Sequence, residues 1–165
     1  CGGWVPWARR GCRRLADGVW FLLKVPGNPE WHPYSLAADG DGTATFLVKH
    51  MGEGSWSAGV VSNPPREVRV EGPYGGPGFT RGHCQALLLV AGGVGLAPLA
   101  RLWQRPPEGI GRVELVWVVR SPEAVQWLPA LLPDALNAQR DIPGSIRVFV
   151  TRQAVRERAP SPTWA

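Results

Sequence analysis

Cysteine and long apolar runs are scarce in this sequence of 165 residues. Its three cysteines, Cys1, Cys12 and Cys84, do not have the spacing of metal ligands and cannot all pair with one another. A disulfide framework is therefore not expected, and a reducing compartment is favoured. The longest uninterrupted apolar run covers only residues 86–91, whereas a membrane-spanning helix needs roughly 20 residues. The sequence predicts no transmembrane segment within these residues.

Nothing in the sequence has the pattern of a signal peptide, an internal repeat or a zinc-binding Cys/His pair. The first residue is Cys1 and the only methionine is Met51, so we expect a piece of a longer chain. The formal net charge is +5, but the positive charge is concentrated near the N-terminus rather than along a nucleic-acid-binding face. We therefore expect a solvated or membrane-facing N-terminal segment, no bound metal and no nucleic-acid partner. The clustered basic residues are Arg9, Arg10, Arg13 and Arg14.

Glycine and proline are abundant instead, with 21 and 17 residues, and they separate short apolar stretches. In the first half, residues 19–25, 43–49 and 67–71 have the composition of short strands. Residues 72–75 are expected to form a turn, and residues 52–57 a loop or the end of a hairpin. Short strands between Gly/Pro turns indicate a β barrel or sandwich, here a partial antiparallel β barrel.

The pattern changes near His83 to an alternation of strands and helices. Buried-type strands are expected at 85–91, 113–119 and 146–150, and helices at 96–104 and from Ser121, as N-cap, to about residue 132. This order is the βαβαβ half of a doubly wound parallel sheet, so the second half is interpreted as a partial α/β doubly wound sheet. We therefore divide the chain into an N-terminal remnant (1–17), a barrel portion (18–82) and a nucleotide-binding portion (83–165).

A glycine loop joins the first strand of the second half to its helix. Glycines at this place allow the backbone to approach a pyrophosphate, and the helix N-terminus supplies free N–H groups. The loop departs from G-x-G-x-x-G because Pro98 stands where the third glycine would be, and a tight turn without a ligand is the alternative. Arg120 ends the next strand. A guanidinium there can bind the 2′-phosphate, which favours NADPH over NADH. The alternative is that the Arg120 side chain is simply solvated.

The motif His32-Pro33-Tyr34-Ser35 follows the first strand. A rigid proline, an aromatic ring and a hydroxyl in sequence would place Tyr34 against a planar ring system, with Ser35 near one of its nitrogens. By composition alone, a turn with a packed aromatic is the alternative. The loop at 52–57 similarly offers glycine and serine to phosphate and Trp56 to adenine, unless it is only a hairpin end.

Taken in order, these stretches resemble the flavin and NADPH domains of the ferric reductase and NADPH oxidase family, truncated at both ends. The resemblance runs from residue 18 to residue 152 without a large gap, and its most specific parts are residues 32–35, 72–75 and 93–98. It implies an NADPH-dependent FAD oxidoreductase. NADPH would give a hydride to FAD, which would pass electrons to haems of an absent membrane domain and then to ferric iron or dioxygen.

The resemblance also implies roles for single residues. Tyr34 would pack on the flavin ring and the Ser35 hydroxyl would lie near its N5, which makes these two the candidate catalytic residues, while His32 and Pro33 would shape the same pocket. The other residues would contact the FAD phosphates (Lys49, Gly54, Trp56, Ser57), close the nicotinamide side (Gly72, Pro73, Tyr74, Gly75), hold the NADPH pyrophosphate (Gly92, Gly93, Val94, Gly95, Pro98) or contact its ribose and 2′-phosphate (Arg120, Thr151).

Two departures from the family bear on completeness. The family's barrel begins one or two strands before the position of Gly18, and residues 1–17 are too short and Arg-rich to be expected to supply them. Its nicotinamide domain also continues beyond the third strand to a Cys-Gly motif, and this sequence ends at Ala165 without one at that place. We therefore expect this stretch alone to be catalytically incomplete.

In the full-length protein, the resemblance places this region on the cytoplasmic side of a membrane enzyme. Two alternatives are a soluble ferredoxin- or flavodoxin-NADPH reductase-like enzyme and a non-catalytic remnant. The flavin motif of the soluble enzymes more often begins with arginine than with the His32-Pro33 found here.

Overall fold

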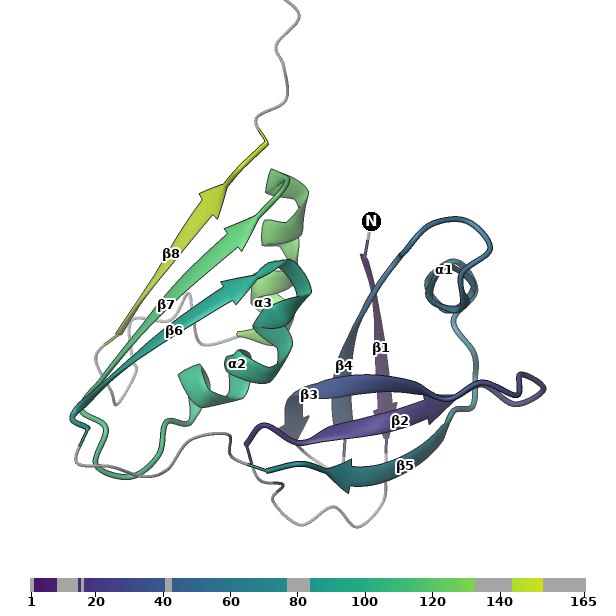
Figure 1. The fold of residues 1–165 in the computed structure, drawn as a ribbon, viewed down its shortest axis with the longest axis horizontal. Helices are drawn as coiled ribbons and strands as arrows, with labels where there is room; N and C mark the ends of the chain where they lie inside the picture. The colour runs from purple at the N-terminus through teal and green to yellow at the C-terminus, as the bar shows by residue number, and fades with distance from the viewer. Residues whose placement is uncertain are drawn as a thin grey trace, which may run out of the picture.

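The computed structural model describes residues 2–8, 15, 17–40, 43–76, 84–132 and 144–152, which form two sheets side by side (Figure 1). The first sheet has five antiparallel strands in the order β1-β4-β3-β2-β5. The second has three parallel strands in the order β6-β7-β8. The expected order, a partial antiparallel barrel followed by a partial parallel α/β sheet, is confirmed. The strands of the first sheet are β1 (Gly2–Ala8), β2 (Trp20–Lys24), β3 (His32–Gly40), β4 (Thr43–Lys49) and β5 (Arg69–Tyr74).

The antiparallel sheet curls around its own small core. Alternate side chains of β2 point inward, so Phe21 and Leu23 are buried while their neighbours are partly exposed. Phe21 meets Phe46 of β4 edge to face, with ring centroids 5.7 Å apart. Aromatic and aliphatic side chains from three strands thus hold the curled sheet together.

Strand β5 extends through residues that were expected to form a turn, so that prediction is wrong for Gly72, Pro73 and Tyr74. Tyr74 pairs with Trp20 of β2. Since β5 lies at the edge of the sheet, a proline in it removes no hydrogen bond that a further neighbouring strand would need. Gly72 and Pro73, which are typical of turns, therefore lie in the edge strand β5.

Strand β3 was missed, and the alternative of a turn at residues 32–35 is wrong. Pro33 pairs with Leu22, and Tyr34 pairs with Phe21 of β2. A proline near the start of the strand, followed by small residues such as Ser35 and Ala37, hides the alternation by which strands are recognised. The flavin-type motif consequently lies on a strand in the middle of the sheet.

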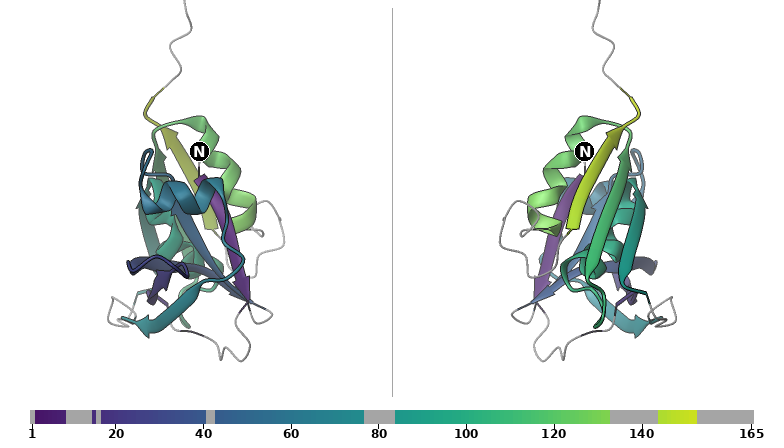
Figure 2. Two further views of the ribbon diagram at one scale, coloured as in Figure 1. Left: turned by 90° about the vertical axis from the view of Figure 1, so that its right-hand side faces the viewer. Right: turned by 90° about the vertical axis from the view of Figure 1, so that its left-hand side faces the viewer.

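Two further elements correct the sequence interpretation. Residues 1–17 were expected to supply no barrel strand, yet β1 pairs along the whole of β4. The stretch expected as a loop or hairpin end leads into a short helix, α1 (Trp56–Ser62), which contacts β1 and β4 (Figure 2). The Ser55 hydroxyl accepts a 3.1 Å hydrogen bond from the Ala58 N–H, which is an N-cap. Cys1, Cys12 and the four N-terminal arginines lie outside the described residues.

The second half follows the expected order closely. The helix expected at 96–104 is confirmed, whereas the helix expected from Ser121 is a 3₁₀ helix that continues into a single α turn. Pro129 explains the difference, because it lacks the N–H that would continue α-helical hydrogen bonding to the preceding turn. The elements are β6 (Ala86–Gly92), η1 (Gly93–Gly95), α2 (Leu96–Gln104), β7 (Arg112–Val119), η2 (Pro122–Trp127), α3 (Leu128–Leu131) and β8 (Gly144–Val150).

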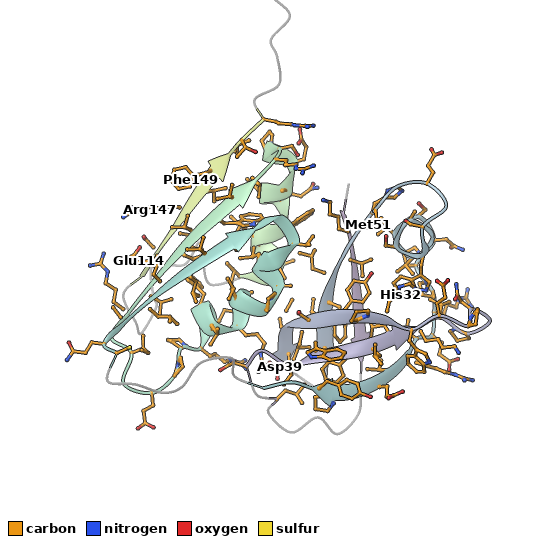
Figure 3. The ribbon with its side chains drawn as sticks, viewed as in Figure 1. His32, Asp39, Met51, Glu114, Arg147 and Phe149 are labelled. Carbon is orange, nitrogen blue, oxygen red and sulfur yellow. The ribbon has the colours of Figure 1, made fainter. Side chains whose placement is uncertain are left out.

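The helices of the second half cover one face of the parallel sheet. On β7 that face buries Leu115 and Trp117 completely. On the other face Leu88 and Val90 are 66% and 62% exposed, and no described residue covers them. Figure 3 shows Phe149 on this same open face. None of the described helices is both long and apolar enough to span a bilayer.

Candidate cofactor site

A cavity of about 820 Å³ lies at the carboxyl ends of the parallel strands, the usual place for ligands in open α/β sheets. The antiparallel sheet contributes Lys49, His50 and Met51, which follow one another at the end of β4. The parallel sheet contributes the start of the glycine loop and the ends of β7 and β8. Of the residues expected to bind cofactors, the cavity brings together Lys49, Gly92, Gly93, Val94, Arg120 and Thr151.

The glycine loop leaves room for a ligand against its backbone. Gly93 has a φ of +50°, a backbone conformation that residues other than glycine rarely adopt. A Cβ on Gly92, Gly93 or Gly95 would meet no atom of the described residues within 4 Å. The loop then enters the nine-residue helix α2, where the Leu96 N–H already donates to the carbonyl oxygens of Gly93 and Val94 and Pro98 carries no N–H. The backbone open to a ligand is therefore that of the loop itself. A pyrophosphate therefore fits this loop.

Trp117 supports the glycine loop through a hydrogen bond, and the sequence did not indicate this role. Its indole Nε1 donates a 2.9 Å hydrogen bond to the carbonyl oxygen of Gly93, and the residue is fully buried. Its ring also lies 6.3 Å from that of Trp127, which lines the cavity. A tryptophan in an apolar strand looks like an ordinary core residue. The sequence indicated a role for Trp117 only through its position on the strand that pairs with β6, which leads into the glycine loop.

Arg120 lies just beyond β7 with an exposed side chain at the cavity. The chain after β8 runs alongside, because the N–H of Thr151 donates to the Val119 oxygen and that of Arg152 to the Arg120 oxygen, both at 2.9 Å. The Thr151 hydroxyl donates to the same Val119 oxygen at 3.2 Å. These hydrogen bonds join the carboxyl ends of β7 and β8 at the cavity.

Glu123 brings a negative charge to the same cavity. A hydrogen bond from the Ser121 side chain, followed by one from its own backbone N–H, lowers the pKa of the Glu123 carboxyl below its usual range. The group is therefore ionised at neutral pH and close in sequence to Arg120. The sequence placed Glu123 only within the helix expected from Ser121.

The flavin-type motif forms an aromatic cluster with α1. The rings of His32 and Trp56 stack at 4.2 Å, and those of Tyr34 and Trp56 lie 5.7 Å apart. Burial raises the pKa of the Tyr34 hydroxyl. Because side chains alternate along a strand, Ser35 lies on the opposite face of β3. The structure therefore brings His32, Tyr34 and Trp56 together, and Ser35 is not part of this cluster.

The indole nitrogen of Trp56 is buried without a hydrogen-bond partner among the described residues. Trp56 and Gly54 also line a second hollow of about 470 Å³, together with Asn28 and Glu30. An unpaired donor beside a hollow with polar walls is compatible with a phosphate- and nucleotide-bearing cofactor such as FAD. Ser57 differs from expectation, since it is buried and accepts a 3.2 Å hydrogen bond from the Met51 N–H.

The residues expected to close the nicotinamide side line neither cavity. A Cβ on Gly72 would lie 2.9 Å from Cδ1 of Phe21, so packing already requires glycine there. The Tyr74 ring lies 4.8 Å from that of Trp20. Its hydroxyl donates to the Glu71 carboxylate, and this hydrogen bond raises the pKa of Tyr74. Neither cavity is lined by the following residues, which were also expected to bind cofactors: His32, Pro33, Tyr34, Ser35, Gly95 and Pro98.

An antiparallel sheet followed by a parallel sheet with a glycine loop is the architecture of ferredoxin reductase-like proteins. The solved ferredoxin reductase in carbazole 1,9a-dioxygenase has the same fold, with a TM-score of 0.71 and 22% identity, covering 94% of this chain and 47% of that one. The ferredoxin NADP⁺ reductase from Neisseria gonorrhoeae, solved with bound FAD and NADP, gives a TM-score of 0.68 and 18% identity, covering 92% and 63%.

Residues 84–162 match the family described as the ferric reductase NAD binding domain. NADPH oxidase 3 of Rattus norvegicus is 28% identical over 143 residues, covering 72% of this chain and 25% of that protein. Ferric reduction oxidase 7 of Arabidopsis thaliana is 27% identical over 157 residues, covering 76% and 21%. The resemblance to the ferric reductase and NADPH oxidase family is therefore confirmed, and its members named here are oxidoreductases. The chain spans about a quarter of the length of these relatives.

Proposed function

We propose that this chain binds FAD on its antiparallel sheet and NADPH on its parallel sheet, as the electron-input region of a ferric reductase or NADPH oxidase type enzyme. The observation that carries the proposal is the cavity in which the end of β4 faces the glycine loop and the ends of β7 and β8. It joins residues of both halves at the edge where α/β sheets bind nucleotides. The proposed domains are residues 18–82 for FAD and 83–165 for NADPH, and β1, within the stretch 1–17 expected as a remnant, adds a strand to the FAD portion.

On the NADPH side, the backbone carries most of the proposed binding. Gly92, Gly93 and Gly95 would let the pyrophosphate approach the backbone of the loop, with Val94 and Pro98 completing the loop. Arg120 would pair with the 2′-phosphate, because a guanidinium binds phosphate through two parallel hydrogen bonds. Thr151 would contact the ribose, since its oxygen can still accept a hydrogen bond.

On the FAD side, Tyr34 would orient the flavin by ring packing and Ser35 would offer a hydroxyl to its N5, with His32 and Pro33 shaping the pocket. Lys49 would neutralise a phosphate, because its side chain is exposed at the cavity. Gly54, Trp56 and Ser57 would lie along the phosphates, and Gly72, Pro73, Tyr74 and Gly75 on the nicotinamide side. Bound FAD would accept the hydride of NADPH and release the electrons singly.

The onward path of the electrons is proposed from the relatives. Their names indicate enzymes that oxidise NADPH or reduce ferric iron. We propose that haems in a membrane domain of the full-length protein take the electrons, with this region on the cytoplasmic side, and that ferric iron or dioxygen is the final acceptor.

The test is to purify the full-length protein and follow its flavin absorbance under anaerobic conditions. The proposal predicts bound FAD whose absorbance near 450 nm decreases on addition of NADPH. A protein that retains neither FAD nor NADPH would be a non-catalytic remnant. Flavin reduction in a protein without haem would favour the soluble reductase instead.

Changing Tyr34 should separate ring packing from hydroxyl chemistry. We expect Tyr34→Ala to weaken FAD binding more than Tyr34→Phe, because phenylalanine keeps a ring of the same shape. Losing one such aromatic contact corresponds to about 0.5–1.5 kcal/mol, or roughly a two- to tenfold rise in the dissociation constant. Equal losses in both variants, measured by FAD titration, would show that the hydroxyl is what matters.

Removing the charge of Glu123 should improve NADPH binding. The carboxylate lines the cavity that holds Arg120 and would repel the 2′-phosphate. We expect Glu123→Gln to lower the KM for NADPH about two- to fivefold, the modest effect of an exposed charge, and to leave the KM for NADH unchanged. Because its pKa is lowered, Glu123 stays ionised throughout the neutral range, so the gain should persist at pH 6 and change only as far as the 2′-phosphate itself takes up a proton. A gain that vanishes at pH 6 would contradict this placement.

A further inference from the structure

A buried ion pair joins the two sheets and includes none of the residues proposed to bind cofactors. Nη2 of Arg101, on α2, lies 3.1 Å from Oδ1 of Asp39, on β3, and the two side chains are 5% and 10% exposed. The same nitrogen donates a 2.7 Å hydrogen bond to the carbonyl oxygen of Leu15. Arg105, which is half exposed, approaches the same Asp39 oxygen to 3.4 Å. Figure 3 shows Asp39 beside α2.

Both partners lie on elements that carry a proposed cofactor motif. Asp39 and Ser35 share β3 and are separated by roughly 13 Å of strand. Arg101 lies on the helix that begins directly after the glycine loop, roughly 9 Å along the axis from Gly95. A change in the geometry of the ion pair therefore changes the distance between the flavin motif and the glycine loop.

Apolar packing alone does not specify the distance between the flavin motif and the glycine loop. Ala37 of β3 is buried in the same cluster as Leu96 and Ala97 of α2. Apolar burial has no preferred direction, and the side chain that β3 contributes to this cluster, Ala37, is small. A buried ion pair is directional, and leaving either charge without its partner is unfavourable. The Arg101 bond to the Leu15 oxygen fixes a second direction.

We infer that Asp39 and Arg101 are positioning residues that hold the glycine loop at the distance from β3 required for hydride transfer between the two cofactors. The inference rests on the proposed function, and neither side chain would touch a cofactor. Displacing reacting groups by about 1 Å can slow a reaction on the order of a hundredfold. The proposed phosphate contacts on each side are made largely within one half of the chain, so a small shift should leave binding nearly intact.

The first test uses Asp39→Asn in the full-length, FAD-loaded protein. We expect the rate constant of flavin reduction at saturating NADPH to fall at least tenfold, while the dissociation constants of FAD and NADPH change by less than about threefold. Arg112→Ala is the matched control, because it removes an exposed ion pair to Glu114 of 2.8 Å at the far end of the sheet. That control should leave the rate constant unchanged.

A second readout needs no activity. In the cofactor-free protein, Asp39→Asn should speed amide hydrogen exchange in α2 and in β3 near Ala37, while the amides of β7 keep their exchange rates. Arg101→Lys keeps the positive charge but not the planar fork, and should fall between wild type and Asp39→Asn in both measurements. It also serves as the test variant should Asp39→Asn not fold.

An unchanged rate constant in both variants would overturn the inference. So would a loss of FAD and NADPH affinity in parallel with a lowered unfolding temperature, because that result describes a general structural role. If wild-type protein shows no flavin reduction by NADPH, the proposed function fails instead. The exchange pattern alone then decides whether the pair fixes α2 on β3.

Discussion

Reduction of the flavin by NADPH is expected to be lost in a Gly95→Val variant that still folds and still binds FAD. Gly95 has a φ of −62° and ψ of −5°, which valine adopts without strain, and a Cβ there would meet no atom within 4 Å in the part of the chain that the structure describes. The added methyl groups would stand beside the backbone of Gly93 and Val94, which line the cavity and which a pyrophosphate would approach. Charge-assisted hydrogen bonds contribute about 1.5–3 kcal/mol each, so losing two raises the dissociation constant for NADPH more than about a hundredfold.

The matched control for Gly95→Val is Gly111→Val, at the opposite end of the parallel sheet. A Cβ there lies at an ordinary 3.7 Å from the Gln85 carbonyl oxygen, and the position is far from the cavity. NADPH titration, the FAD content and the unfolding temperature should all match wild type in this control. Loss of bound FAD together with NADPH binding in Gly95→Val would indicate misfolding and contradict the proposed role of the loop.

Arg120→Ala is expected to abolish most of the preference for NADPH over NADH. Only NADPH carries the 2′-phosphate, so the KM for NADPH should rise while that for NADH stays nearly constant. A charge-assisted hydrogen bond of about 1.5–3 kcal/mol corresponds to a change in preference on the order of ten- to a hundredfold. Steady-state kinetics of the full-length protein with both nucleotides measures it directly.

Salt provides an independent check on Arg120. Because the side chain is exposed, the wild-type preference for NADPH should shrink as ionic strength rises, whereas the variant should respond little. Equal losses of NADH and NADPH activity in Arg120→Ala would place Arg120 on a group common to both nucleotides, such as the ribose or the pyrophosphate.

The second half of the fold could be predicted from sequence because its signals are local. An apolar run, three glycines and an amphipathic stretch specify the strand, loop and helix from Ala86 to Gln104. The same is true of β4, whose buried and partly exposed residues mostly alternate. Where each residue type favours the structure it occupies, the order of elements can be predicted without knowledge of their packing.

Elements stabilised by distant partners could not be predicted. β1 is rich in glycine and β5 contains Gly72 and Pro73, and both are strands because β4 and β2 offer them hydrogen bonds. The bond from Trp117 to the glycine loop and the pairing of Asp39 with Arg101 join residues 24 and 62 positions apart. No spacing rule relates such residues, so the sequence indicated the cofactor motifs but not the side chains that position them.

The most direct test of the account is anaerobic stopped-flow reduction of the FAD-loaded full-length protein with NADPH carrying deuterium at the transferring C4 position. Direct hydride transfer between the two proposed sites predicts that the absorbance near 450 nm decreases in a single NADPH-dependent step, and that deuterium slows this step. Bleaching that proceeds at the same rate with both nucleotides would place another event before or in place of hydride transfer. Absence of bleaching in protein that retains FAD would contradict the claim that this chain brings the two cofactors together.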